Sequence, residues 1–418
     1  MSPTGRTLDV LLHGQLVGQI SLDRAGEGTF KYLPDTVKEH WAEPLLSCSM
    51  PVGPEPFNSV LTRNWFSGLL PEGDQRAAAA RAAGVPSHDD FLLLEKIGWE
   101  CAGAVAVGPA GFAPEQEASL QLVSHEELAS MLDRLPQWPV QDAGEVRSSL
   151  GGFQSKLLLT RVGEGWALPL QGAISTHLVK PEKTEYQGMA AAEAWAMTLA
   201  GAATPAAAVS MMGNPEDVPA LLVTRFDRTG TKDGVRRLHQ EDGCQMLGSP
   251  PHAKYASDSA VNSDGSRAVR PSLHKIAGAV SRYSNDPRVQ LLTLLRQVTV
   301  NIAVGNAGAH AKNYSLMLGP VGCSVSPMYD VVPTMHFLPQ TDSAGLWVNG
   351  NSTMNRIFAD DIAEEGASWG IPRRLASATV KATLERLGAS IQSASDAFPS
   401  VPDDIPAMVA VRIARMQP

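Results

Sequence analysis

The pattern of hydrophobic and polar positions changes in character along the chain. In the first half, short apolar or alternating runs bounded by turn residues are typical of strands, with helical spacing between them. Residues 8–22 are predicted to form a hairpin that turns at His13-Gly14. Further strands are expected at 101–108, 156–160, 175–182 and 220–228, and helices at 77–84, 88–98, 124–135 and 189–201. Beyond residue 228 the chain becomes mainly helical, so the sequence predicts an α+β fold.

The stretch 294–317 differs from the rest because an apolar helical run leads directly into a polar loop. Gly305 ends the run, and a Gly-led loop of this kind places side chains at the mouth of a cleft. The loop carries four polar residues with useful chemistry: Asn306, His310, Lys312 and Asn313. An acidic residue, Asp330, lies in the segment 327–330 that follows this stretch. We therefore expect the functional site here.

In kinases, an Asn and a later Asp hold magnesium on the phosphates, while another Asp orients the attacking hydroxyl. Asn313 and Asp330 match the first two in type and order. Oxygen ligands of this kind suit Mg²⁺, which keeps waters and bridges phosphates. The attacking-side Asp is missing, because its expected place reads Ala307-Gly308-Ala309.

Composition narrows the class of protein. With 418 residues and 44% hydrophobic residues, the chain has ample core for two or three domains. A net charge of -9 argues against nucleic-acid binding through the overall field. The four scattered cysteines suggest neither a zinc site nor a disulfide framework, and no signal peptide or membrane span is visible. We expect a soluble, cytoplasmic protein with no membrane partner.

Two upstream segments could bind phosphate. Gly151-Gly152 lies between a pair of serines and the strand that begins at Lys156, so its backbone amides could approach a phosphate. Alone, such a hairpin is usually only a turn, and no Walker A sequence occurs. Strand residue Lys180 followed by helix residue Glu193 matches the kinase arrangement for the α- and β-phosphates, but a surface Lys and a solvated Glu are an equally good interpretation.

Two other short polar segments give weaker evidence of function. Glu100 and Cys101 are explained best by packing at a turn. His239, Glu241 and Asp242 could suggest a metal site, but their spacing offers no ligand face, and we expect the acids to cap a helix.

Ten motifs in register, over nearly the whole chain, resemble the HipA family of bacterial serine/threonine kinases, toxins of type II toxin–antitoxin modules. They are LSCSMP, LLPEG, LLLEKIGWECAGAV, SSLGGFQSK, THLVKPE, RFDR, LHQEDGCQMLG, KY at 254–255, GNAGAHAKNYS and YDVVP. The resemblance implies a bilobal kinase-like fold with an additional N-terminal subdomain. It divides the chain at 1–110 (N-terminal subdomain), 111–224 (kinase N-lobe) and 225–418 (helical C-lobe).

The resemblance also implies roles for single residues. Ser149, or its neighbour Ser148, matches an autophosphorylated serine; Asn313 and Asp330 match the magnesium ligands, and His310 and Lys312 lie in the catalytic loop. The remaining implied contacts are to ATP: Gly151, Gly152, Phe153 and Lys156 in the phosphate loop, Lys180 at the phosphates, Arg225 and Phe226 at adenine, and Asp227 at the ribose. ATP and Mg²⁺ are the implied cofactors.

Gly308 is the departure from the family pattern. Family members usually carry the catalytic Asp at this position, and a positioned general base contributes about 10²–10⁴-fold in rate. Phosphoryl transfer should therefore be nearly absent, while nucleotide and metal binding could survive. A single inactivating change in a toxic kinase is the favoured explanation, and a natural pseudokinase is the alternative.

Three hypotheses follow. The first is a Ser/Thr kinase toxin whose target, by resemblance, is an aminoacyl-tRNA synthetase. The second is a catalytically silent partner that holds a HipB-like helix-turn-helix antitoxin and helps repress its operon, touching DNA only through that antitoxin. The third, a nucleotide-binding enzyme such as a ligase, ignores the pair formed by Asn313 and Asp330.

Overall fold

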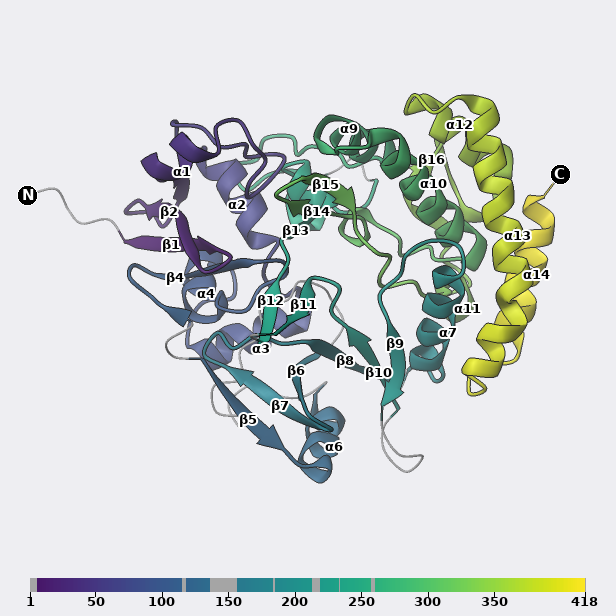
Figure 1. Cartoon of the computed structure of the whole chain (residues 1–418), viewed down its shortest axis with the longest axis horizontal. Coiled ribbons are helices and arrows are strands. Elements are labelled where there is room, and N and C mark those ends of the chain that lie inside the picture. Colours follow the sequence, from purple (N-terminus) through teal and green to yellow (C-terminus); the bar gives the residue numbers. More distant parts are fainter. Residues whose placement is uncertain are drawn as a thin grey trace, which may run out of the picture. The chain divides into compact units, whose positions relative to one another are not determined.

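The computed structural model describes residues 6–114, 118–135, 156–182, 185–212, 219–232, 234–256 and 260–417. The chain forms two compact units, each built from separate segments (Figure 1). Unit one comprises Met1–Lys180, Asp227–Pro251 and Val261–Ala268. Unit two comprises Pro181–Phe226, His252–Ala260 and Val269–Pro418.

Unit one begins with a four-stranded antiparallel sheet in the order β3-β2-β1-β4, of which Figure 1 labels β1, β2 and β4. Its strands are β1 (Thr7–Leu12), β2 (Gln15–Leu22), β3 (Gly28–Tyr32) and β4 (Val105–Pro109). The predicted hairpin at 8–22 is confirmed, because β1 pairs with β2 across His13 and Gly14, both of which have positive φ. Alternation along β3 buries Phe30 and Tyr32 on one face.

Helices cover this sheet and complete its core. They are α1 (Pro34–Glu39), α2 (Ser59–Ser67), α3 (Gly73–Ala83) and α4 (Asp90–Ile97). Trp65 and Phe66 of α2 are fully buried, and Phe66 packs against Phe30 with ring centroids 5.4 Å apart. Each such side chain contributes about 1.5–3 kcal/mol through burial. This core supports the turn after α4, where Glu100 lies.

The rest of unit one holds a second antiparallel group of strands in the order β5-β7-β6-β8. Their bounds are β5 (Ser119–Val123), β6 (Leu157–Val162), β7 (Gly165–Leu170) and β8 (His177–Pro181). The helix predicted at 124–135 is α6 (His125–Arg134), and it begins with a capping box formed by Ser124 and Glu127. Four short elements complete the unit: β11 (Arg228–Thr231), β12 (Gly234–Arg237), β13 (Gln240–Asp242) and α8 (Gly243–Met246).

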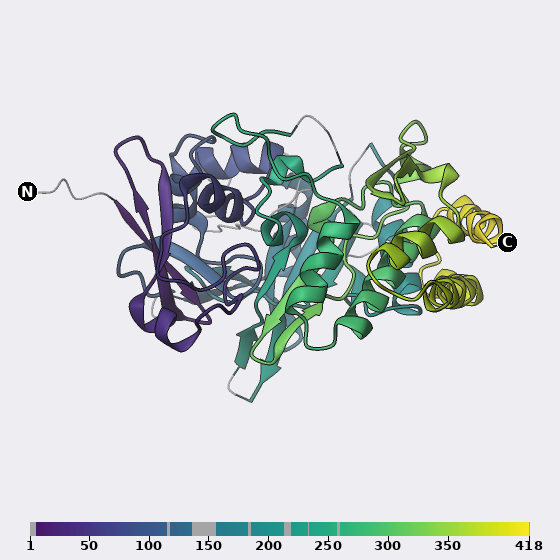
Figure 2. The same cartoon turned by 90° about the horizontal axis from the view of Figure 1, so that it is seen from above.

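Unit two is mainly helical and is built around α10 (Pro287–Val304), whose residues 297–304 are all buried. A helix buried on every side is a core helix. Helices α9 (Leu273–Tyr283), α12 (Ala359–Ser368), α13 (Arg373–Ala397) and α14 (Asp404–Met416) pack against it. Figure 2 looks nearly along the axes of α13 and α14.

Further elements of unit two accompany these helices. They are α7 (Met189–Gly201), β9 (Val209–Met212), β10 (Ala220–Thr224), the 3₁₀ turns η2 (Pro251–Ala253), η3 (Ala311–Asn313) and η4 (Met354–Arg356), β14 (Ser315–Gly319), β15 (Gly322–Val325), α11 (Thr334–Phe337), β16 (Ser343–Val348) and β17 (Asn351–Thr353). The polar residues inside α10 are paired: Gln297 Nε2 donates to the Ser326 carbonyl (2.7 Å) and Asn301 Nδ2 to Tyr314 Oη (3.2 Å). These bonds fix the helix next to the segments that carry the site. The predicted α+β class is confirmed.

Candidate active site

The loop after α10 is held by hydrogen bonds within unit two. Gly305 ends the helix with a φ of 81°, a left-handed conformation that favours glycine. Asn306 then turns back, and its Nδ2 donates to Asn301 Oδ1 at 3.0 Å and to the Asp330 carbonyl at 3.2 Å. The side chain of Asn306 therefore joins the helix end to the segment that carries Asp330.

Thr334 holds the same loop from the other side. The backbone N–H of Ala307 donates to Thr334 Oγ1 at 2.8 Å, and that hydroxyl donates to the Gly305 carbonyl at 3.3 Å. Beyond it, the His310 N–H donates to the Gly308 carbonyl at 2.7 Å. The backbone at Gly308 is thus fixed on both sides by bonds that do not involve a side chain at that position.

Asn313 and Asp330, predicted to act together, lie side by side. Asn313 ends η3, and its Nδ2 donates to Asp330 Oδ2 at 3.0 Å. Asp330 has a φ of 59°, which is uncommon for a residue other than glycine but tolerated by Asp and Asn. Both side chains are partly exposed, so a ligand can reach them.

The chemistry of this pair fits a magnesium ion that is shared with phosphates. One carboxylate and one amide supply the oxygen ligands that Mg²⁺ prefers, and the ion usually completes its shell with water and substrate. Within the described ranges, no group of three or more His, Cys, Asp and Glu residues forms a dedicated metal cage. The pair therefore fits a metal that arrives with its nucleotide.

The two other polar residues of the loop face different surroundings. Lys312 is 8% exposed, and its carbonyl accepts a hydrogen bond from Tyr329 Oη at 2.7 Å. His310 is half-buried, and its ring meets Tyr255 edge-on with centroids 5.1 Å apart. Tyr255 belongs to the KY step at 254–255, so the structure brings two of the sequence motifs together.

Phe226 stacks on Tyr329, next to Asp330. The ring centroids are 5.3 Å apart and the ring planes differ by 29°. Arg225, its predicted companion at the adenine, is buried. Phe226, which was predicted to meet the adenine, is thus in direct contact with the segment predicted to bind metal, within unit two.

The remaining predicted ATP contacts in the described chain belong to unit one. Lys156 precedes β6 and is half-buried, and Lys180 lies on β8 with 8% exposure. Asp227 is 3% exposed, and its Oδ2 accepts the Gly103 N–H at 2.7 Å. Ser148, Ser149, Gly151, Gly152 and Phe153 lie outside the described residues.

The interpretation of Lys180 and Glu193 as a surface lysine and a solvated glutamate is wrong. Glu193 lies on α7 in unit two and is 2% exposed, and Lys180 is nearly as buried. Burial of charged side chains is expensive, so both residues have a structural or binding role.

The acids after His239 divide into two roles. Asp242 caps α8 as expected, since its Oδ1 accepts from the N–H groups of Cys244 and Gln245. The expectation that Glu241 also caps the helix is wrong. Glu241 is 1% exposed and accepts from Ser47 Oγ at 2.6 Å, from the Cys48 N–H at 2.7 Å and from Trp65 Nε1 at 3.2 Å. These partners are far away in the sequence, so local spacing could not reveal them.

Burial of Glu241 makes stability depend on pH. Burial raises its pKa from 4.5 to about 7 despite its hydrogen-bond donors. The folded state then binds one more proton than the unfolded state between these values, so the free energy of unfolding falls as pH rises from 4.5 to 7. The loss is about 3 kcal/mol, because one pKa unit corresponds to about 1.4 kcal/mol. Glu241→Gln should remove this loss.

The measurement is urea unfolding of the parent and Glu241→Gln at several pH values. His239 acts in the opposite direction, because burial lowers its pKa to about 4 and stability due to it is lost as pH falls below 6.5. The difference between the two proteins therefore isolates Glu241. Parallel stability curves would contradict the assignment.

Two residues that contact the site were not singled out from the sequence: Thr334 and Tyr329. Thr334 and Tyr329 both flank Asp330, so proximity to the predicted metal ligand was the available signal. Glu100 was assigned to packing at a turn, and it does lie at the turn after α4, but its carboxylate holds Ser175, Arg228 and Arg237. Those contacts span long sequence separations and leave no local pattern.

No helix in the described part of the chain is long and apolar enough to cross a membrane.

Comparison with known proteins finds family matches in both the N-terminal and the C-terminal part of the chain. Residues 8–108 match the family described as the HipA N-terminal domain, and residues 148–393 match the HipA-like C-terminal domain. Y4mE of Sinorhizobium fredii, named as a candidate kinase, is 33% identical over 94% of each chain. The serine/threonine-protein kinase toxin HipA of Shewanella oneidensis is 28% identical over 97% of this chain and 94% of its own.

A solved structure agrees with these matches. It is the Shewanella oneidensis complex of HipA, HipB and operator DNA, and its matching chain is 26% identical with a TM-score of 0.82. The match covers 98% of this chain and 97% of that one.

Proposed function

This chain belongs to the HipA family, and on that premise we propose that it has the architecture of a serine/threonine protein kinase toxin that binds ATP and Mg²⁺. The observation that carries the proposal is the Asn313–Asp330 pair, 3.0 Å apart beside the loop that ends α10. An Asn and a later Asp in this relation are the metal-binding residues of kinases. The α+β fold, which is similar to that of HipA, agrees with this proposal.

In this proposal, the side-chain oxygen of Asn313 and the Asp330 carboxylate would hold the magnesium, which would neutralise charge on the phosphates. Lys180 adds positive charge at the α- and β-phosphates, and Phe226 packs against the adenine. Asp227 accepts a hydrogen bond from the ribose. His310 and Lys312 shape the catalytic loop, Lys312 through its carbonyl bond from Tyr329.

The phosphate loop and its regulation belong to the same proposal. Gly151, Gly152, Phe153 and Lys156 contact the phosphates, and Ser149, or Ser148, accepts phosphate in an autophosphorylation that shuts the site. The three-part division at 1–110, 111–224 and 225–418 assigns this loop to the kinase N-lobe. Arg225 lies at the hinge with Phe226.

The proposed cellular role follows the family. The acceptor protein is an aminoacyl-tRNA synthetase in the cytoplasm, and its modification slows translation and arrests growth. As written, the chain is disabled for this step, because Gly308 cannot take a proton from the attacking hydroxyl. A single inactivating change explains an otherwise intact set of site residues better than a natural pseudokinase does.

Nucleotide binding by the chain as written tests the proposal. Isothermal titration calorimetry should detect saturable ATP binding in Mg²⁺ that weakens strongly when the metal is removed with EDTA. Binding survives the lack of a base because Gly308 is not among the proposed ATP or metal contacts. Absence of ATP binding in both conditions would refute a nucleotide-dependent kinase.

Gly308 itself favours a second function, that of a catalytically silent partner of a DNA-binding antitoxin. The related Shewanella oneidensis HipA was solved with HipB and operator DNA. This chain carries a net charge of -9, so we expect it to reach DNA only through a HipB-like helix-turn-helix protein. Mobility-shift assays with the chain alone, the antitoxin alone and both together decide the matter. Failure to alter the antitoxin–DNA complex contradicts this role.

A further inference from the structure

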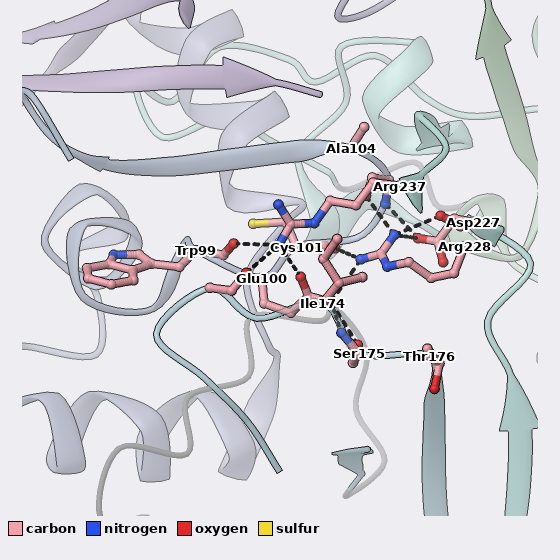
Figure 3. A network of polar contacts seen from close by, with 12 residues as sticks. Trp99, Glu100, Cys101, Ala104, Ile174, Ser175, Thr176, Asp227, Arg228 and Arg237 are labelled. Atoms are coloured by element: carbon pink, nitrogen blue, oxygen red, sulfur yellow. Dashed lines mark hydrogen bonds and ion pairs between the residues drawn. The ribbon is translucent and has the colours of Figure 1, made fainter. Parts of the chain in front are cut away.

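A buried cluster of charges surrounds Glu100 in unit one (Figure 3). We call it the Glu100 network; it comprises Glu100, Gly103, Ser175, Asp227, Arg228 and Arg237. Glu100 Oε1 accepts from the Ser175 N–H at 3.1 Å, from Ser175 Oγ at 2.7 Å and from Arg228 Nη2 at 2.9 Å. Its side chain is only 5% exposed.

Arg237 engages the second oxygen of the same carboxylate. Its Nη2 donates to Glu100 Oε2 at 2.6 Å and to the Gly172 carbonyl at 2.9 Å. Two arginines and two carboxylates balance in charge, and the charged side chains are at most 7% exposed. Because a buried ion pair is weak evidence of stabilisation, the cluster needs another explanation.

The network extends from Glu100 to Asp227 through Arg228. Arg228 Nη1 lies 3.2 Å from Asp227 Oδ2, while its Nη2 pairs with Glu100. The same Nη1 donates to the Gly103 carbonyl at 2.8 Å, and the Gly103 N–H donates to Asp227 Oδ2 at 2.7 Å. The carboxylate of Asp227 is thus oriented by a guanidinium and by a backbone amide, both tied to the turn at 100–103.

Gly103 fits tightly against the segment that follows Asp227. Its φ is 72°, and an added Cβ would lie 2.8 Å from the Gln240 nitrogen and 2.9 Å from His239 Nδ1. No larger residue could bring the amide so close. Glycine at this position therefore lets the turn pack against residues 239–240 while its amide donates to Asp227.

We propose that Glu100 is a positioning residue for nucleotide binding: through Arg228 and the 100–103 turn it holds the Asp227 carboxylate in the orientation that binds the ribose of ATP. The N-terminal domain, matched over residues 8–108, thereby supplies part of the nucleotide site of the domain matched over 148–393. This inference rests on the proposed kinase function and on the ribose role of Asp227 within it.

Ribose hydroxyls provide a direct readout. ATP and 2′,3′-dideoxy-ATP are titrated into the full chain with Mg²⁺, and their affinities are compared. A hydrogen bond to a charged group contributes about tenfold or more in affinity, so the parent should prefer ATP by about that factor. Glu100→Gln keeps the size of the side chain but removes the charge that holds Arg228. We expect it to lower ATP affinity about tenfold and to leave dideoxy-ATP affinity unchanged.

Glu241→Gln is the matched control. Glu241 is another buried glutamate of unit one, but its partners are Ser47, Cys48 and Trp65. It should leave the preference for ATP intact. If Glu100→Gln does not fold, Arg228→Lys replaces it, since a lysine keeps the positive charge but cannot bridge two carboxylates in the same way. That variant should lose the same preference.

The possible outcomes of these titrations distinguish failure of the Glu100 inference from failure of the proposed function. If Glu100→Gln or Arg228→Lys retains the parent's preference, or weakens both nucleotides equally, Glu100 has only a structural role and the inference fails. If the parent binds both nucleotides equally, Asp227 does not bind the ribose, although kinase function survives. If the parent binds neither, the proposed function fails together with the inference.

Discussion

Gly308→Asp should raise the rate of phosphate transfer from γ-labelled ATP by about 10²–10⁴-fold, the contribution of a positioned general base. The proposed metal-binding part of the machinery is present in the described part of unit two. The Asn313–Asp330 pair is formed, and Asn306 and Thr334 fix the loop backbone without help from residue 308. Residue 308 lacks the carboxylate that would take the proton from the attacking hydroxyl.

The structure can accommodate this side chain. Gly308 does not adopt a left-handed φ, so an L-residue is unstrained there. An added Cβ would lie 3.3 Å from Asn306 Oδ1 and 3.7 Å from Thr334 Cγ2, which requires a shift of a few tenths of an ångström at most. The restored aspartate should therefore leave the fold unchanged.

Gly308→Asn is the control for this prediction. It has the same shape as aspartate but cannot act as a base, so it should remain as inactive as the parent. Mass mapping should find the transferred phosphate on the peptide that contains Ser148 and Ser149. Equal activity of the Asn and Asp forms, or no activity in either while ATP binds, would show that Gly308 is not the missing base position.

The sequence predicted the elements whose signals are local. Apolar periodicity predicted α10, and Gly305 predicted its end, because a left-handed C-cap favours glycine. Order along the chain paired Asn313 with Asp330, and the structure places them in contact. Asp242 was predicted as a cap from its position before a short helix, and it is one.

Residues whose roles depend on distant partners could not be predicted in the same way. Glu241 was predicted to cap a helix, yet it is enclosed by a loop and a helix from nearly two hundred residues earlier. Glu100 was predicted to pack at a turn, and its arginine partners follow more than a hundred residues later in the sequence. Nothing in the local pattern distinguishes a buried carboxylate from an exposed one, so tertiary contacts decided both cases.

Asp330→Asn should weaken Mg²⁺-dependent ATP binding about tenfold to a hundredfold, the loss typical when even a supporting metal contact is removed. Asn and Asp share the tolerance for the left-handed φ of 59° found here, so the backbone should not change. What is lost is the negative charge beside Asn313. Calorimetry at several Mg²⁺ concentrations measures the effect, and thermal unfolding should be unaltered.

Asp330→Ala separates charge from conformation. Alanine lacks both the carboxylate and the preference for positive φ, so it should lose metal-dependent binding and also destabilise the protein by about 1–2 kcal/mol. Asp330→Asn should share only the first effect. If Asp330→Asn binds ATP with the same Mg²⁺ dependence as the parent, Asp330 is not a metal ligand. Its contact with Asn313 would then serve only to join η3 to the segment before α11, and the observation on which the kinase proposal rests would lose its force.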